Sequence, residues 1–160
     1  MLRPVRKMDA YPLYLSLQAA ASFSFALIFT INMIYQVETV GLTPLQLVLV
    51  GTALEVSVFL FEVPTGIVAD VFSRRASTLI GYMIIGAGFI LEGSIPAFWA
   101  VVTGQALWGL GYTFTSGATQ AWLSDEIGEA NANRAFLRGQ QMSQLGALLG
   151  ILTSVWMAGF

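Results

Sequence analysis

The chain has 160 residues, of which 56% are hydrophobic and only 10% are charged. A soluble domain of average composition carries about a quarter charged residues, so the composition excludes a water-soluble globule and predicts an integral membrane protein. The mean hydropathy of +0.74 points the same way. The chain has no cysteine and no histidine, which excludes disulfides, thiol nucleophiles, and histidine-based metal sites and triads. A net charge of −2 gives no support for nucleic-acid binding.

Five apolar stretches are long enough to cross a bilayer, which takes about 20 residues for a helix. The predicted spans are 11–35, 45–68, 76–95, 98–123 and 142–160. We therefore expect an all-α fold with a single transmembrane domain over residues 1–160. The basic start of the chain precedes an apolar run that is too long for a signal peptide, so we interpret this run as an uncleaved first span. Glu92 and Gly93 interrupt the third span near its outer end.

The seven basic residues all lie in alternate loops of this arrangement. They are Arg3, Arg6, Lys7, Arg74, Arg75, Arg134 and Arg138. Positive charge collects on the cytoplasmic side of membrane proteins, so the pattern predicts a cytoplasmic N-terminus. We expect the protein to be integral to the plasma membrane, as a prokaryotic cytoplasmic membrane protein.

Local signals mark the helix ends and the helix contacts. Thr43, followed by Pro44 and Gln46, forms the pattern of a capping box at the start of the second span. Pro64 removes a main-chain hydrogen bond, so a kink is expected there. Gly146 and Gly150 have the four-residue spacing of a close helix–helix contact.

Two acidic residues stand within the apolar second span. Glu55 and Glu62 are seven residues apart, so they share one helix face about 10 Å apart along the axis. An acidic residue at the membrane centre costs about 2.5–3.5 kcal/mol on insertion scales. It must therefore face a polar cavity, find a partner or stay protonated. Cation or proton exchange and interhelical packing are both open explanations.

The fourth predicted span carries a stripe of small and polar residues. The stripe consists of Gln105, Gly109, Tyr112, Ser116 and Thr119. Such a stripe either lines a water-filled path or packs tightly on a neighbouring helix. Asn32 in the first span is a candidate for the same space, whereas Trp108 is interpreted as a helix-packing residue.

The loop after the second span reads Gly66-Ile-Val-Ala-Asp70-Val-Phe-Ser-Arg74-Arg75. A glycine, an aspartate four residues later and a basic pair beyond it resemble the signature loop of the major facilitator superfamily. The fourth span adds Gln105-Ala-Leu-Trp-Gly109-Leu-Gly111. It is similar to the Arg-x-x-x-Gly-x-Gly pattern of proton-coupled members, with Gln105 in place of the arginine. The whole chain resembles the N-terminal portion of a twelve-helix, drug-efflux-like member.

The resemblance implies a gate at the cytoplasmic face. Asp70, Arg74, Arg75 and Asp125 would form a charge cluster that holds this side closed in one state. Gly66 would allow the second helix to approach a helix of the other half of the transporter. The alternative is that the same charges only anchor the loop at the membrane surface.

The leading hypothesis is a secondary transporter of small molecules that works by alternating access, with proton-coupled efflux of amphipathic compounds as its specific form. Its expected partners are the lipid bilayer, a small-molecule substrate, protons and a missing C-terminal half of the same protein. The candidate residues for coupling or substrate binding are Glu55, Glu62, Gln105, Tyr112 and Asn32. No cofactor or metal is expected.

Two other classes of protein can be compared with the transporter hypothesis. The alternative to a transporter is a small oligomerising membrane pore, or a structural or assembly protein without transport of its own. A membrane-embedded protease is disfavoured because Asp70 and Asp125 lie beside arginines, which hold such acids ionised. The chain is therefore not expected to be an enzyme.

Overall fold

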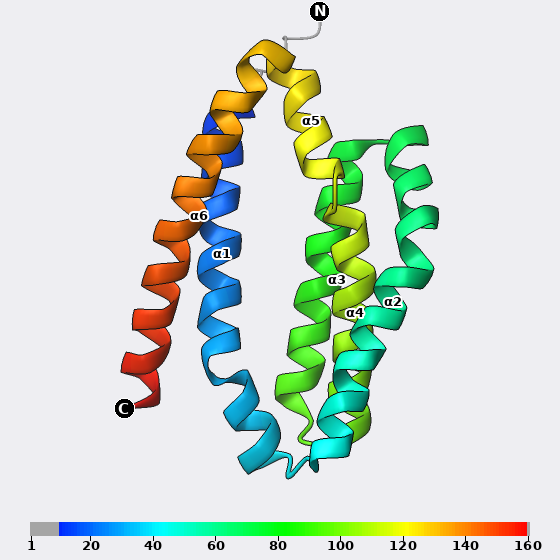
Figure 1. Ribbon diagram of the computed structural model, residues 1–160, viewed down its shortest axis with the longest axis vertical. Coiled ribbons are helices and arrows are strands. Elements are labelled where there is room, and N and C mark those ends of the chain that lie inside the picture. The colour runs from blue at the N-terminus through cyan, green and yellow to red at the C-terminus, as the bar shows by residue number, and fades with distance from the viewer. Residues whose placement is uncertain (1–9, 160) are drawn as a thin grey trace, which may run out of the picture. The chain divides into compact units, whose positions relative to one another are not determined.

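The computed structural model describes residues 10–159, and this range contains helices and no β-strand. The helices are α1 (Ala10–Ile34), the π-helix η1 (Tyr35–Thr39), α2 (Pro44–Val71), α3 (Arg74–Ser94), α4 (Phe98–Thr115), α5 (Ala118–Ile127) and α6 (Glu129–Ala158) (Figure 1). They divide into two compact units. One is Met33–Trp122, and the other holds the described residues up to Asn32 and from Leu123 onward. The predicted all-α class is confirmed for the described residues.

In the unit that contains both ends of the described chain, α1 and α6 run parallel and touch through glycines. A Cβ on Gly146 would collide with the Ala19 carbonyl, and a Cβ on Gly150 would collide with the Phe23 carbonyl. The Ser154 hydroxyl donates to the Leu27 carbonyl at 2.8 Å. Only glycine allows the two backbones to come this close. The close-contact role predicted for Gly146 and Gly150 is confirmed.

In the other unit, α4 lies between α2 and α3, parallel to α2 and antiparallel to α3 (Figure 1). A Cβ added to Gly109 would lie 2.7 Å from the Leu54 carbonyl oxygen on α2. On the α3 side, a Cβ on Gly88 would lie 2.7 Å from the Gly104 carbonyl oxygen, and one on Gly111 would lie 2.6 Å from the Gly81 carbonyl oxygen. Glycines on both sides of α4 therefore set the spacing of all three helices.

The start of α2 carries the predicted capping box. The Gln46 amide donates to the Thr43 hydroxyl at 3.4 Å, and the Thr43 amide donates to the Gln46 side-chain oxygen at 2.9 Å. Pro64 lies inside a helix that continues to Val71, and α2 bends along its length in Figure 1.

The predicted spans agree with the helices in part. Within the described residues, three helices are long and apolar enough to cross a membrane: Ala10–Thr39, Pro44–Val71 and Arg74–Ser94. The predicted span 98–123 is not one continuous helix, because α4 ends at Thr115 and α5 begins at Ala118. Gly117 between them has φ +73°, a conformation that glycine adopts without strain. The predicted fifth span falls on the second half of α6, and the count of five spans stays a prediction.

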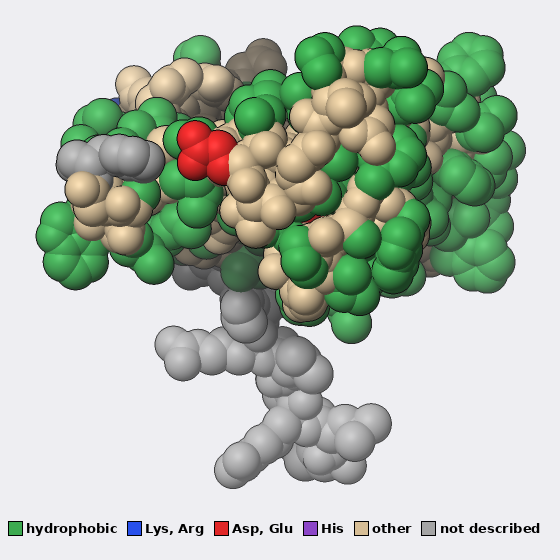
Figure 2. Space-filling view, turned by 90° about the horizontal axis from the view of Figure 1, so that it is seen from below, with side chains coloured by type: hydrophobic (Ala, Val, Ile, Leu, Met, Phe, Trp, Pro, Cys, Tyr) green, Lys and Arg blue, Asp and Glu red, His purple; other side chains and the backbone are tan. Residues whose placement is uncertain are grey.

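The surface is strongly apolar. Large hydrophobic residues are exposed along α2, among them Phe59, Val63, Ile67 and Val71, and hydrophobic side chains dominate the view in Figure 2. Burying such a surface in water-excluding surroundings is what stabilises a membrane protein in its bilayer.

Candidate functional site

The most polar buried site in Met33–Trp122 is centred on Glu92, two residues before the end of α3. Glu92 is only 2% exposed. The Gln36 side-chain amide donates to its Oε1 at 2.8 Å, and the Gln105 side-chain amide donates to its Oε2 at 3.0 Å. The Tyr35 hydroxyl donates to the Glu92 main-chain carbonyl at 2.8 Å. Each carboxylate oxygen thus has an amide donor, which a buried acid needs.

Three elements bring these groups together. The α-helix of α1 ends at Ile34 and continues as the π-helix η1, which carries both Tyr35 and Gln36. Short π-helical turns are frequently found at functional sites. On the α4 side, a Cβ on Gly104 would lie 3.1 Å from Cβ of Glu92. The lack of a side chain at this position leaves room for the glutamate.

No basic side chain of this unit lies near the Glu92 carboxylate. The only basic residues in Met33–Trp122 are Arg74 and Arg75, which begin α3 about 27 Å away along the helix axis. Glu92 is therefore a buried acid held by neutral amides. A buried charge without a cation is costly, whereas two hydrogen bonds to the charged form lower that cost.

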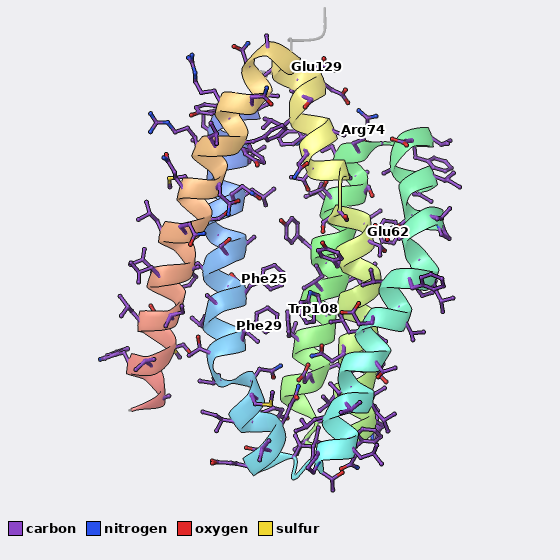
Figure 3. All side chains as sticks on the ribbon, in the orientation of Figure 1. Phe25, Phe29, Glu62, Arg74, Trp108 and Glu129 are labelled. Atoms are coloured by element: carbon purple, nitrogen blue, oxygen red, sulfur yellow. The ribbon has the colours of Figure 1, made fainter. Side chains whose placement is uncertain are left out.

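Gln105, a predicted coupling residue, is part of this site, and it is 4% exposed. The residues of the stripe predicted around Gln105 have different surroundings in the structure. Gly109 packs against α2 and Tyr112 is exposed, whereas Ser116 lies beyond the end of α4. The end of α4 therefore interrupts the stripe, and its role as a lining or as a packing surface stays a prediction. The interpretation of Trp108 as a packing residue is supported by its ring contact with Phe89, at 5.9 Å between centroids (Figure 3).

Glu55 and Glu62 are both exposed on α2, where Figure 3 labels Glu62. Phe59, which lies between them in the sequence, is 82% exposed. The buried polar residues of α2 are Ser57 and Thr65. The role of both acids in coupling stays a prediction.

The predicted gating loop is formed in part. Arg74 Nη2 lies 3.3 Å from Asp70 Oδ1, one helical turn away, and the Asp70 side chain is 70% exposed. An exposed pair of this kind contributes about 0–1 kcal/mol. Arg75 is exposed, and a Cβ on Gly66 would meet nothing within 4 Å. The helix face around Gly66 is therefore free to receive another segment.

Two predicted residues lie in the other unit. Asp125 is on α5 and Asn32 is near the end of α1, and both belong to the unit that holds the two ends of the described chain. Their predicted roles beside Asp70 and Gln105 stay predictions. Arg3, Arg6 and Lys7 lie outside the described residues.

Sequence reasoning missed Glu92 and Gln36 as site residues. In the sequence, Glu92 is only an interruption of an apolar span, and Gln36 directly follows the predicted first span 11–35. The sequence does contain a signal for Glu92, because an acidic residue within a membrane segment indicates a functional site by default. The same rule that singles out Glu55 therefore singles out Glu92, but it does not identify the hydrogen-bond partners.

Comparison with curated proteins gives three significant relatives, all of them transporters. An uncharacterized transporter of Buchnera aphidicola, BU466, is 36% identical over 76 residues, which is 48% of this chain and 19% of that protein. The MFS-type transporter YxaM of Bacillus subtilis is 24% identical over 110 residues, 69% of this chain and 28% of the relative. The inner membrane transport protein YajR of Escherichia coli is 28% identical over 97 residues, 61% of this chain and 20% of the relative.

The matched segments span less than a third of each relative's length. No family model matches the chain, and no solved structure matches it significantly.

The chain thus combines helices that are apolar enough to cross a membrane with similarity to parts of three membrane transport proteins. One of these relatives is a transporter of the major facilitator type, in agreement with the resemblance of the loop motif, and the chain is similar to one part of such a transporter. The relatives are transporters rather than enzymes, in agreement with the prediction that the chain is not an enzyme. The drug-efflux branch stays a prediction.

Proposed function

We propose that the chain forms part of a secondary transporter that moves small molecules across the membrane by alternating access. The observation that carries this proposal is the similarity to three transporters, found over as much as 69% of the chain. Transporters of this family bind their substrate near the middle of the membrane, between two halves that rock against each other. The specific form that we propose is proton-coupled efflux of amphipathic compounds from a prokaryotic cell.

The exposed face of α2 supports a missing C-terminal half as the partner of this chain. Glu55 and Glu62 are exposed in the middle of an apolar helix. Contact with acyl chains would cost about 2.5–3.5 kcal/mol for an acid at the membrane centre. We infer that this face meets an aqueous path or the second half of the transporter. An intact mass of the native gene product more than twice 17.3 kDa is expected.

At the cytoplasmic end of α2, we propose that Asp70 and Arg74 form the start of the gate, with Arg75 and Asp125 as further members. The 3.3 Å contact between Asp70 and Arg74 supports this proposal. The open face of Gly66 supports the approach of a helix from the second half. A weak, exposed ion pair is suited to a gate, because a gate must open at a small free-energy cost.

The test is transport by the complete gene product in proteoliposomes with an imposed proton gradient. A fluorescent amphipathic cation serves as the substrate. We expect saturable, gradient-dependent movement of the dye, and a loss of at least ten-fold in Glu55→Gln with an unchanged amount of folded protein. Glu126→Gln, which alters an exposed acid on α5, is the matched control.

Non-saturable leakage of ions and dye without a gradient would instead identify the oligomerising pore. Full gradient-dependent transport by Glu55→Gln would remove Glu55 from the mechanism and leave it a packing or surface role. No movement of any tested solute, with folded protein present, would count against transport by this protein.

A further inference from the structure

The Glu92 site has a property that the exposed acids Glu55 and Glu62 lack within the described residues: its carboxyl group can be hydrogen-bonded in both protonation states. In the ionised state the carboxylate only accepts, and the amides of Gln36 and Gln105 donate to its two oxygens. In the protonated state one carboxyl oxygen becomes a donor. If either side-chain amide rotates by a half turn, its carbonyl oxygen takes the place of its NH₂ group and accepts the hydrogen bond from that donor.

The surroundings of the carboxylate contain amides and no nearby cation of this unit. Glu92 is 2% exposed, and Arg74 and Arg75 stand at the other end of α3. The side-chain amides of Gln36 and Gln105 donate to its two oxygens. The titratable group that faces Glu92 from η1 is Tyr35, which donates to the main-chain carbonyl of Glu92. From α4 the site is faced by Gln105 and the backbone of Gly104, neither of which titrates.

A proton has a short route to this site. Glu92 lies two residues before the end of α3, and Gly93 and Ser94 beyond it are exposed. The proton comes from water at this end of the helix, binds one carboxylate oxygen and changes the charge of the site from −1 to 0. Neither a metal nor another reactant is needed.

We propose that Glu92 is a proton-binding site, and that its protonation weakens the contact between α3 and η1. Gln36 is the side-chain link between η1 and the carboxylate. Hydrogen bonds to a charged group are about twice as strong as those between neutral groups, so ionised Glu92 holds Gln36 more firmly than protonated Glu92 does. Glu92 is thus a positioning residue for the end of the first helix. The inference deepens the proposed proton coupling by naming its residue, yet the proton binding itself does not depend on transport.

The test combines two measurements on the complete gene product in lipid nanodiscs. The first is an infrared pH titration of the carbonyl band of protonated carboxyl groups. The second is a pulsed electron-resonance distance between spin labels at Val37→Cys on η1 and Trp99→Cys on α4. Both positions are exposed, and the segment itself contains no native cysteine. Neither measurement requires a substrate or active transport.

In the protein with native Glu92, acidification is expected to add a carboxyl band and to broaden the distance distribution. Glu92→Gln, which mimics the neutral form, should lose that band and show the broad distribution at every pH. Glu38→Gln removes an exposed acid from the same π-helix and should behave like native protein. Retention of the full set of bands in Glu92→Gln, or an unchanged pH response of its distances, would overturn the proposal.

A second variant covers the case in which Glu92→Gln fails to fold. Gln36→Leu leaves Glu92 in place and removes the hydrogen bond from η1 to its carboxylate, while the Tyr35 bond to the Glu92 main-chain carbonyl remains. We expect the pH response of the label distance to be lost in Gln36→Leu, whereas the carboxyl band remains at a shifted frequency. A full distance response in this variant, or a spectrum identical to that of native protein, would equally overturn the proposal. If both pH responses follow the proposal but no solute is moved, the transport hypothesis alone fails.

Discussion

At the scale of single residues, the two amides around Glu92 are the feature most sensitive to substitution. Gln105 is buried and donates to Oε2 of Glu92 at 3.0 Å. An apolar residue of similar size would leave that oxygen without its donor. The penalty for a buried acceptor without a partner is about 1–3 kcal/mol, and more for a charged group.

We therefore expect Gln105→Leu to lower the thermal unfolding midpoint of the purified protein by several degrees. Gln120→Leu, at an exposed position on α5, is the matched control and should leave the midpoint unchanged. The measurement is thermal unfolding in detergent at neutral pH, followed by tryptophan fluorescence. Equal midpoints for both variants would show that the hydrogen bond between Gln105 and Glu92 contributes nothing to stability.

At the scale of helices, the spacing of α3 and α4 depends on paired glycines rather than on large side chains. A methyl group at Gly88 would lie 2.7 Å from the Gly104 carbonyl oxygen and 3.2 Å from Cβ of Leu107. Backbone atoms cannot move aside as a flexible side chain can. Overpacking of this kind typically costs about 1–3 kcal/mol.

The expected result is that Gly88→Ala destabilises the protein by about 1–3 kcal/mol and moves Gln105 out of reach of Glu92. Gly86→Ala is the control on the same helix, because a Cβ there would meet nothing within 4 Å. It should be neutral or stabilising, since alanine favours a helix over glycine by about 0.8–1 kcal/mol. Denaturant unfolding of the two variants side by side makes the comparison. A Gly88→Ala protein as stable as Gly86→Ala would disprove the close contact.

At the scale of the whole molecule, the distribution of positive charge predicts which ends of the helices face the cytoplasm. The segment itself lacks cysteine, so single cysteines can be labelled in a cysteine-free form of the gene product. Phe72→Cys lies after α2 next to the arginines, and Glu38→Cys lies on η1, and both positions are exposed. The positive-inside rule places the first inside the cell and the second outside.

In intact cells, a membrane-impermeant maleimide should label Glu38→Cys and spare Phe72→Cys. After permeabilisation both should react. The reverse pattern in intact cells would overturn the cytoplasmic N-terminus. Labelling of both positions in intact cells would show that Pro44–Val71 does not separate the two sides of a membrane.

Local features of the fold could be predicted from the sequence because they depend on residues close together in the chain. The capping box of Thr43 and Gln46 joins residues three apart, and its pattern is specific. The close contacts of Gly146 and Gly150 follow from their spacing on one helix face. The break after Thr115 was not predicted, because the segment around Ser116 and Gly117 lies within an otherwise apolar run.

The site around Glu92 could not be predicted, because its partners are distant in sequence. Gln36 is 56 residues from Glu92, and Gln105 is 13 residues from it across a helical hairpin. Only the register of α3 on α4 and the position of η1 decide that these three side chains meet. The sequence by itself determined the apolar, membrane-compatible character, the helical class and the resemblance to a transporter family, because hydropathy and short motifs carry them. The tertiary structure alone decided which acid is buried and which is exposed, because burial depends on the neighbours that packing supplies. Glu92 is surrounded by amide donors, whereas Glu55 lies on a helix face that is open within the described chain.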